Sequence, residues 1–470
     1  MEHEREILDG YEDAYAFLDK MNIHQVRAVS RAFGVNVTTT TPKHELIVET
    51  IGVCSGSLLP RPRSKKGPKV KAEKASPECV EKVRGVIMQC KARLPYRLPN
   101  AKPVNFEMHD AEGEEIPSYS YTDECIAGIL ETDETGGGRL RSADFYAKES
   151  DPYVSEKIVR LYGLRAGDFI SGYLERGENI PRVAQLVAVE GYSPVFLDRK
   201  KFEDLTAAYP DSQFFLGGGC GTLDLFDRIC PIGFGQRVAV LARHGAGVTS
   251  FFRVAAEAAK RAGAVPIFVM LGQRPEEIAE FAAESARGTV AATSFDQPRA
   301  QGGYIASLAL KRAKRLAECG KDVVLFIDSM TSLYRAYLDC YSLAETEETR
   351  RSALLSVKHF FAAARRLVNA GSLTVFAAEG EALGEELQKD FLAAANAQIV
   401  LSSELAADGV FPSVSLSECR TQRPYAFFNE REAAASRRIR AALSEGGMQN
   451  ALDVLQKEKM NSDSDKRIKE

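Results

Sequence analysis

The sequence lacks several features that would place it in a specialised class. Its nine cysteines include no C-x-x-C pair and no Cys/His cluster at zinc spacing, which favours reduced structural thiols. No segment approaches the roughly 18 continuous apolar residues of a membrane span. The acidic N-terminal segment has no apolar core of a signal peptide. We therefore expect a cytoplasmic protein with no zinc and no membrane span.

A strong charge imbalance is also missing. The net charge of -4 over 470 residues is too small to indicate a partner, so any nucleic-acid binding must come from local basic surface. The hydrophobic share of 45% and the charged share of 27% are ordinary for a globular protein. The length suggests two to four domains.

The first half of the chain changes character twice. Apolar residues at helical spacing predict a small helical unit over 11–52, with Gly34 ending one helix and Thr41-Pro42 starting the next. Residues 53–120 contain the basic run RPRSKKGPKVKAEK and repeated prolines, which predict a mostly flexible linker insert. A basic arm that follows a phosphate backbone is the alternative. Short strand-like runs over 121–195 predict a small β-barrel.

Residues 196–440 alternate apolar strands with amphipathic helices, and 441–470 are expected to form a C-terminal tail. The expected strands are VAVLA (238–242), IFVML (267–271), VVLFI (323–327) and LTVFA (373–377). Continuous apolar strands separated by helices predict an α/β fold with a parallel sheet covered on both faces.

The first of these strands runs through ARHGAGVTS into a helix, where a phosphate-binding loop is expected. The candidate nucleotide-binding residues are Gly245, Ala246, Gly247, Val248, Thr249 and Ser250. Val248 occupies the position of the usual lysine, and Ala242 that of the first glycine. A comparable electrostatic donor contributes roughly 3 to 4 kcal/mol to a transition state, so its loss predicts weakened hydrolysis. A glycine turn that binds no nucleotide is the alternative.

Two further strand ends carry polar side chains. Asp328 follows the strand 323–327 in the pattern of a magnesium-organising aspartate, and Thr249 is a second candidate magnesium ligand. Gln273, followed by Arg274, stands where a glutamate would polarise the attacking water. An amide can hydrogen-bond to water but cannot act as a base.

Together these segments resemble one family, the bacterial transcription termination factor Rho. The resemblance rests on DPYVSEKIVRLYGLRAGDFISG (151–172), QRPEEIAEF (273–281), DVVLFIDSMTSLYRAY (322–337) and VFPSV (410–414), among other stretches. It implies a RecA-like P-loop parallel-sheet C-terminal domain, preceded by a small helical subdomain and an OB/cold-shock-like barrel. It also implies a homohexamer that binds RNA, uses ATP with magnesium to move along it and release the transcript, and has RNA polymerase as a partner.

The resemblance assigns further site residues by position. Phe411 matches the aromatic residue against adenine, while Tyr153 and Arg141 match RNA contacts in the barrel. Arg139 replaces one base-stacking phenylalanine, and Gly137 replaces another. Stacking is worth roughly 1 to 3 kcal/mol per base, and arginine recovers only part of it.

The sequence departs from the family pattern mainly at positions that bind phosphate or take part in hydrolysis. Gly245 and Val248 replace two lysines, Gln273 replaces the catalytic glutamate, and Gln422 follows threonine where the arginine finger is expected. A one-residue slip to Arg420 or Arg423 is the alternative for the finger. In the family, two segments line the central channel of the ring and carry lysines. The matching segments here, 344–352 and 391–396, lack those lysines.

These departures spare the apolar strands. They favour a Rho-like RNA-binding protein with weakened or lost hydrolysis, acting as a homohexamer or in co-assembly with Rho-like subunits. An active RNA-dependent ATPase that terminates transcription and a scaffold that binds neither ligand are the alternatives.

Overall fold

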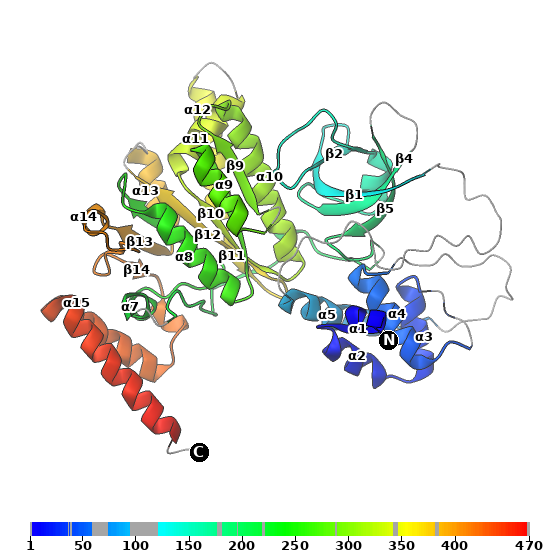
Figure 1. The fold of residues 1–470 in the computed structure, drawn as a ribbon, viewed down its shortest axis with the longest axis horizontal. Helices are drawn as coiled ribbons and strands as arrows, with labels where there is room; N and C mark the ends of the chain where they lie inside the picture. Colours follow the sequence, from blue (N-terminus) through cyan, green and yellow to red (C-terminus); the bar gives the residue numbers. More distant parts are fainter. Residues whose placement is uncertain are drawn as a thin grey trace. The chain divides into compact units, whose positions relative to one another are not determined.

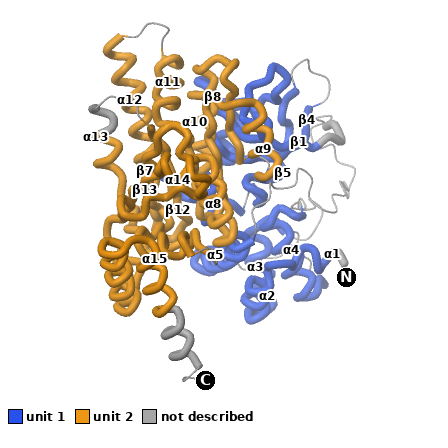
Figure 2. The backbone as a smooth tube through the Cα atoms, turned by 60° about the vertical axis from the view of Figure 1, so that its left-hand side comes forward, with its two compact units in different colours: residues 1–204, 286–288, 314–320 blue, residues 205–285, 289–313, 321–470 orange. Residues whose placement is uncertain are grey.

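We describe the protein from a computed structural model, whose described residues are 2–35, 37, 40–58, 74–94, 121–175, 181–194, 196–218, 221–286, 289–341, 346–380 and 385–467. The chain forms two compact units (Figure 2). Unit 1 comprises residues 1–204, 286–288 and 314–320, and unit 2 comprises the remainder. In the described part of the chain, every helix is too short or too polar to cross a membrane.

Unit 1 begins with a group of helices: α1 (Glu2–Leu8), α2 (Glu12–Asp19), α3 (Ile23–Ala32), α4 (Lys43–Ser55) and α5 (Pro77–Arg93). Asn22 separates α2 from α3, because its side chain accepts the Gln25 amide in a capping box. Gly34 follows α3 in the left-handed conformation (φ +84°), as predicted. The expected Thr41 cap is wrong: Pro42 holds the cap position of α4, without a side-chain hydrogen bond.

Helix α5 lies within the segment predicted to be a flexible linker, so the structure corrects that part of the prediction. Its start is well defined, since the Ser76 hydroxyl accepts the amide of Cys79 and Pro77 fills the first turn. Val83 and Ile87 are buried in the core of the helical group. Residues 59–73 and 95–120 of the predicted linker lie outside the described residues.

The second part of unit 1 is a five-stranded antiparallel sheet in the order β3-β2-β1-β4-β5. Its elements are β1 (Tyr121–Thr132), β2 (Gly138–Arg141), β3 (Tyr153–Val154), α6 (Glu156–Leu161), β4 (Phe169–Glu175) and β5 (Val183–Val189), followed by a 3-10 turn at Phe202–Asp204. A bridge between Tyr153 and Arg182 brings β3 back toward the start of β5. Leu130, Leu140 and Ile170 are buried inside.

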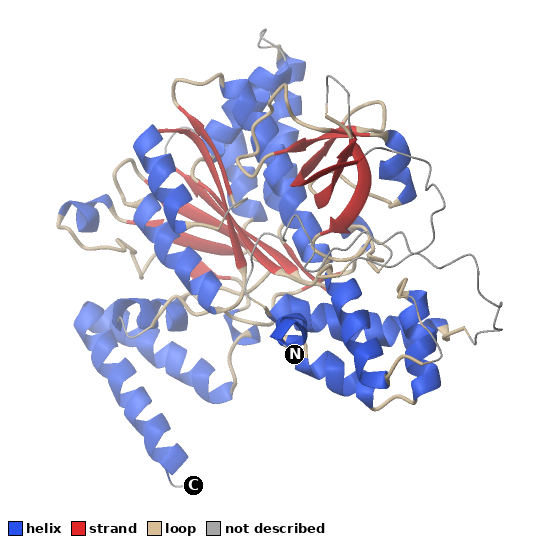
Figure 3. Ribbon diagram, turned by 45° about the vertical axis from the view of Figure 1, so that its right-hand side comes forward, coloured by secondary structure: helices blue, strands red, loops and turns tan. Residues whose placement is uncertain are grey.

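Unit 2 is built around a nine-stranded mixed sheet flanked by helices (Figures 1 and 3). Its strands are β6 (Ala207–Ala208), β7 (Arg237–Ala242), β8 (Val265–Gln273), β9 (Val290–Ser294), β10 (Asp322–Ile327), β11 (Arg365–Leu367), β12 (Ser372–Glu379), β13 (Ala397–Leu401) and β14 (Arg420–Thr421). Its helices are α7 (Gly221–Ile229), α8 (Val248–Arg261), α9 (Pro275–Glu284), α10 (Arg299–Glu318), α11 (Met330–Tyr341), α12 (Glu347–Ala362), α13 (Glu385–Ala394), α14 (Ser403–Ala407) and α15 (Glu430–Arg467), with a 3-10 turn at Pro424–Ala426. The last turn of α10 groups with unit 1.

All four predicted apolar strands form the centre of this sheet. The order β13-β7-β12-β10-β8-β9 is parallel throughout, whereas β14 pairs antiparallel to β13 at one edge. Because parallel strands share the direction of their carboxyl ends, the ends of β7, β8, β10 and β12 meet at one edge of the sheet. Gly245 to Ser250 follow β7, Arg274 follows β8 and Asp328 follows β10, whereas Phe411 lies after α14.

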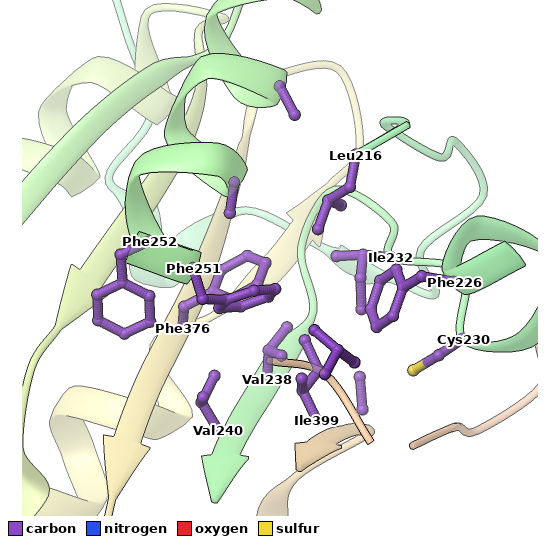
Figure 4. Close-up of a cluster of buried hydrophobic side chains, with 14 of the residues drawn as sticks. Leu216, Phe226, Cys230, Ile232, Val238, Val240, Phe251, Phe252, Phe376 and Ile399 are labelled. Atoms are coloured by element: carbon purple, nitrogen blue, oxygen red, sulfur yellow. The ribbon is translucent and has the colours of Figure 1, made fainter. Parts of the chain in front are cut away.

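The core of unit 2 fixes the first turn of α8. Phe251 and Phe252 extend from α8 (Figure 4). The ring of Phe252 lies 5.1 Å from that of Phe326 on β10, and the ring of Phe326 lies 5.1 Å from that of Phe376 on β12. Ala255 and other alanines of α8 are fully buried, which allows close approach of the helix to the strands. The position of the preceding loop is therefore set by dense packing.

The end of the chain is also part of unit 2, which corrects the expectation of a simple tail. Helix α15 is interrupted at Gly447, whose backbone is not helical. After this break, Ala451 and Leu455 are buried in the core beside α7. The two segments are joined by an ion pair of 2.7 Å between Arg438 and Glu458.

Candidate nucleotide site and RNA-binding face

The loop between β7 and α8 has the backbone of a phosphate-binding loop. Gly245 (φ +80°) and Gly247 (φ +81°) adopt the left-handed conformation that glycine allows without strain, and Gly247 is the residue before the first turn of α8. The first amides of that helix have no partner within it, so they form an anion-binding end. Ala246 is buried, and its carbonyl accepts a hydrogen bond from the Ser413 hydroxyl.

The side chains of this loop do not supply the expected cation. Val248, at the position of the lysine, is half-buried and packs against the hydrophobic core of unit 2. Gly245 and Thr249 are exposed. Valine has neither a charge nor a donor, so at positions 245 and 248 the loop offers a phosphate only backbone amides.

Asp328 and Gln273, 55 residues apart in sequence, are brought into direct contact. The Gln273 Nε2 donates to Asp328 Oδ2 at 2.5 Å, and the Leu271 amide donates to the same carboxylate at 3.1 and 3.3 Å. Burial raises the pKa of Asp328 to about 7, although these hydrogen bonds favour the charged form. The glutamine at the catalytic position is thus the hydrogen-bond donor of the aspartate.

The space around this pair is small and mostly apolar. A cavity of about 20 Å³ is lined by Val248, Thr249, Phe252, Phe268, Val269, Met270, Gln273, Phe281, Phe326 and Asp328. A volume of that size holds about one water molecule. Arg274 is exposed and occupies the residue before α9, outside the cavity lining.

These residues do not fit a magnesium ion as they stand. Magnesium keeps several waters and is bound through one or two carboxylates with substrate phosphates. Asp328 is occupied by internal donors, which leaves the neutral hydroxyl of Thr249. Within the described ranges, no group of three or more His, Cys, Asp or Glu side chains has the arrangement of a metal site.

Phe411, the residue predicted to contact a base, lies against the phosphate loop. A side-chain carbon added at Gly247 would stand 2.8 Å from Phe411 Cε1, so glycine is needed for this approach. The ring remains 54% exposed, which leaves an aromatic face for a planar ligand.

The arginine-finger segment is engaged within its own chain. Gln422 donates to the Ala395 carbonyl at 3.1 Å, and Arg420 donates twice to Gln398 Oε1, at 2.6 and 3.0 Å. The guanidinium of Arg423 lies 3.9 Å from the centre of the exposed Tyr209 ring, and its backbone has φ +52°.

The channel segments show no substitute lysine in their described parts. Thr346 caps α12, whose first turn carries Glu347 and Glu348, while residues 344 and 345 lie outside the described chain. Phe391, at the start of the second segment, is buried with its ring 4.7 Å from that of Phe361.

On the barrel, the predicted RNA-contacting arginines donate to groups of the barrel, Arg141 to two carboxylates and Arg139 to a backbone carbonyl. Arg141 Nε donates to Glu131 at 2.6 Å and its Nη1 donates to Asp151 at 2.7 Å. Burial disfavours the charge of Arg141, but these hydrogen bonds outweigh it and raise its pKa. Arg139 is half-buried and donates to the Asp151 carbonyl at 3.2 Å. Both guanidinium groups are therefore held by the barrel itself.

Tyr153 lies directly across from Arg139 in the β2–β3 pairing. Its hydroxyl covers Gly137, where an added side-chain carbon would stand 2.3 Å from the Tyr153 oxygen. The space that a phenylalanine at position 137 would require is therefore filled by Tyr153. The structure places Arg139 and Arg141 on β2 and Tyr153 on the adjacent strand β3.

Sequence reasoning missed several residues of these sites. Arg243 and His244 are exposed in the phosphate loop, and their basic side chains could have marked them as candidate phosphate contacts. Glu131 and Asp151 were missed because their pairing with Arg141 depends on the fold of the barrel. Glu379, at the end of β12, is buried and accepts from the Thr331 amide and hydroxyl at 3.0 and 2.8 Å.

Comparison with known proteins agrees with this division of the chain. Residues 126–193 match the family model "Rho termination factor, RNA-binding domain", and residues 222–420 match "ATP synthase alpha/beta family, nucleotide-binding domain". These matches coincide with the antiparallel sheet of unit 1 and the parallel sheet of unit 2. The fold is thus an α/β RecA-like P-loop domain preceded by an OB-type domain.

The similarity to curated proteins extends over most of the chain. Transcription termination factor Rho of Streptomyces coelicolor is 32% identical over 387 residues, which are 79% of this chain and 92% of that protein. Its counterpart in Streptosporangium roseum is 34% identical over 344 residues, 71% of this chain and 88% of that protein. The chain therefore belongs to the family of transcription termination factor Rho.

Proposed function

We propose that this chain is an RNA-binding protein of transcription termination whose nucleotide site hydrolyses ATP slowly or not at all. The observation that carries the proposal is the 2.5 Å hydrogen bond from the Gln273 amide to Asp328. An amide that donates to the aspartate cannot accept a proton from water, so the position of the general base is without a base.

The substitution at Val248 acts in the same direction. Phosphoryl transfer depends on positioning and on neutralising charge at the terminal phosphates. A half-buried aliphatic side chain at this place packs with the core instead. The backbone of the loop and the exposed ring of Phe411 remain suited to hold a nucleotide. ATP binding without efficient turnover is the function that this combination favours.

On this proposal the protein is a regulatory member of its family. It would assemble as a homohexamer or with Rho-like subunits, and RNA polymerase would be a partner through termination. RNA would bind at the barrel face around Arg139 and Tyr153. Because two carboxylates neutralise Arg141, its attraction to RNA phosphates would be weaker than that of an arginine without such partners.

An active RNA-dependent ATPase is the second candidate. Arg423 favours it, because an exposed arginine with positive φ at the expected finger segment is strained in a way that often accompanies function. Its guanidinium rests on the exposed Tyr209 ring, from which it would have to be released to reach a nucleotide.

The proposal is tested by measuring phosphate release with and without poly-C RNA, alongside RNA binding by fluorescence anisotropy. The native chain should bind RNA and release no phosphate above the blank. The double variant Val248→Lys/Gln273→Glu restores the missing cation and base, and any turnover it gains should depend on both changes. RNA-stimulated turnover by the native chain would select the second candidate.

A further inference from the structure

We infer that the nucleotide site of this protein takes its ligand without magnesium, as the free nucleotide anion. This inference rests on the proposed nucleotide binding and specifies its chemistry. It follows from how the carboxylates at the carboxyl edge of the sheet are used.

Asp328 has become an internal hydrogen-bond acceptor. Its Oδ2 accepts from Gln273 at 2.5 Å and from the Leu271 amide at 3.1 Å, while Oδ1 lies 3.3 Å from the same amide. A metal ion at this carboxylate would have to displace the glutamine amide. A glutamate at position 273 would offer no amide donor, so this engagement is specific to glutamine.

The second carboxylate at the same edge of the sheet, that of Glu379, also accepts hydrogen bonds from within the protein. Glu379 ends β12, which lies between β7 and β10 in the sheet. Both of its oxygens accept from Thr331, one from the backbone amide and one from the hydroxyl. Thr331 lies in the first turn of α11, so the carboxylate satisfies an amide at a helix N-terminus. It is 3% exposed and therefore closed to solvent ions.

The surroundings disfavour a hydrated cation. Val248, Phe252 and Phe326 line the cavity beside Asp328, and its volume of about 20 Å³ has room for about one water. Magnesium dehydrates reluctantly and retains several waters in such sites. The neutral Thr249 hydroxyl alone does not replace a carboxylate ligand. Phosphate binding is then left to the amides of the loop and the exposed basic side chains Arg243 and His244.

The test is calorimetric titration of the full-length protein with ADP, in magnesium chloride and in EDTA. Free magnesium should change the dissociation constant by less than about twofold, whereas a site that binds the metal with the phosphates gains tenfold or more. Asp328→Asn preserves the size and acceptor oxygen of the side chain and should leave ADP affinity in magnesium unchanged. A tenfold loss in that variant would assign Asp328 to a metal and overturn the inference.

A gain-of-function variant supplies the complementary arm. Gln273→Ala removes the amide donor and should create a magnesium-dependent increase in ADP affinity of at least about fivefold, with Gln456→Ala on the exposed face of α15 as the matched control. No increase in a folded Gln273→Ala protein would contradict the assigned role of Gln273. An absence of ADP binding in both buffers would refute the proposed nucleotide binding itself, whereas binding strengthened by magnesium refutes only the metal-free site.

Discussion

Replacing Gln273 by glutamate is the perturbation whose consequences the structure defines most closely. The change exchanges a donor 2.5 Å from Asp328 Oδ2 for a second carboxylate of nearly the same shape. A hydrogen bond to a charged group contributes about 1.5 to 3 kcal/mol. Two like charges about 4 Å apart add repulsion of up to about 4 kcal/mol at an effective dielectric constant of 20, which solvent reduces at this half-buried site. Gln273→Glu should therefore destabilise unit 2 by about 2 to 4 kcal/mol at pH 9 in EDTA.

The raised pKa of Asp328 determines how the stability of the native protein and of the variant changes with pH. The pKa of Asp328 is raised from 3.8 to about 7, so the folded protein binds a proton that the unfolded chain releases between those values. Stability from this group is complete below about pH 4 and is lost as the pH rises through 7. The stability of Gln273→Glu should fall more steeply with rising pH than that of the native protein, because one of its two adjacent carboxyl groups must stay protonated. At pH 5 its deficit should largely disappear.

The assay is urea unfolding followed by circular dichroism, which suits a chain without tryptophan. Gln456→Glu, an exposed change on α15 with the same chemistry, is the control and should leave the unfolding midpoint unchanged. Asp328→Asn should flatten the pH dependence between 4 and 7. Equal stability of Gln273→Glu and native protein at pH 9 would refute the hydrogen bond on which the account rests.

Three further predictions concern other parts of the chain. Glu131→Gln removes one of the two negative charges beside Arg141 and should raise RNA affinity severalfold at low salt, with a salt dependence steeper by about one phosphate contact, measured by anisotropy. Gly137→Ala should destabilise the barrel by about 1 to 3 kcal/mol in thermal melting, because the new carbon meets Tyr153. Leu455→Ala should cost about 2 to 5 kcal/mol in urea unfolding, whereas a dispensable tail would show no change.

The sheet of unit 2 was predictable because its strands are continuous apolar runs. Burial on both faces of a parallel sheet removes polar residues from such strands, and that signal is local in sequence. The helix α5 was missed because prolines around it indicated a linker. Pro77 in fact occupies the first turn of the helix, where proline is favoured, and Val83, Ile87 and Cys90 have helical spacing.

The contacts of the candidate sites were less accessible to sequence reasoning. Gln273 and Asp328 were identified separately, but their hydrogen bond depends on the adjacency of β8 and β10. Arg141 was predicted to contact RNA, yet its partners Glu131 and Asp151 each lie ten residues away. The β1–β2 pairing and the loop before β3 bring them together. The carboxylates that compete with RNA for Arg141 can therefore be identified only once the arrangement of the strands is known.

The most direct test of the central claim is the rate of phosphate release by the purified native protein with saturating ATP, magnesium and poly-C RNA. With the base position filled by an amide and the lysine position by valine, the rate should equal that of a Thr249→Ala/Asp328→Asn variant and the protein-free blank. RNA-stimulated turnover that this variant abolishes would contradict the claim.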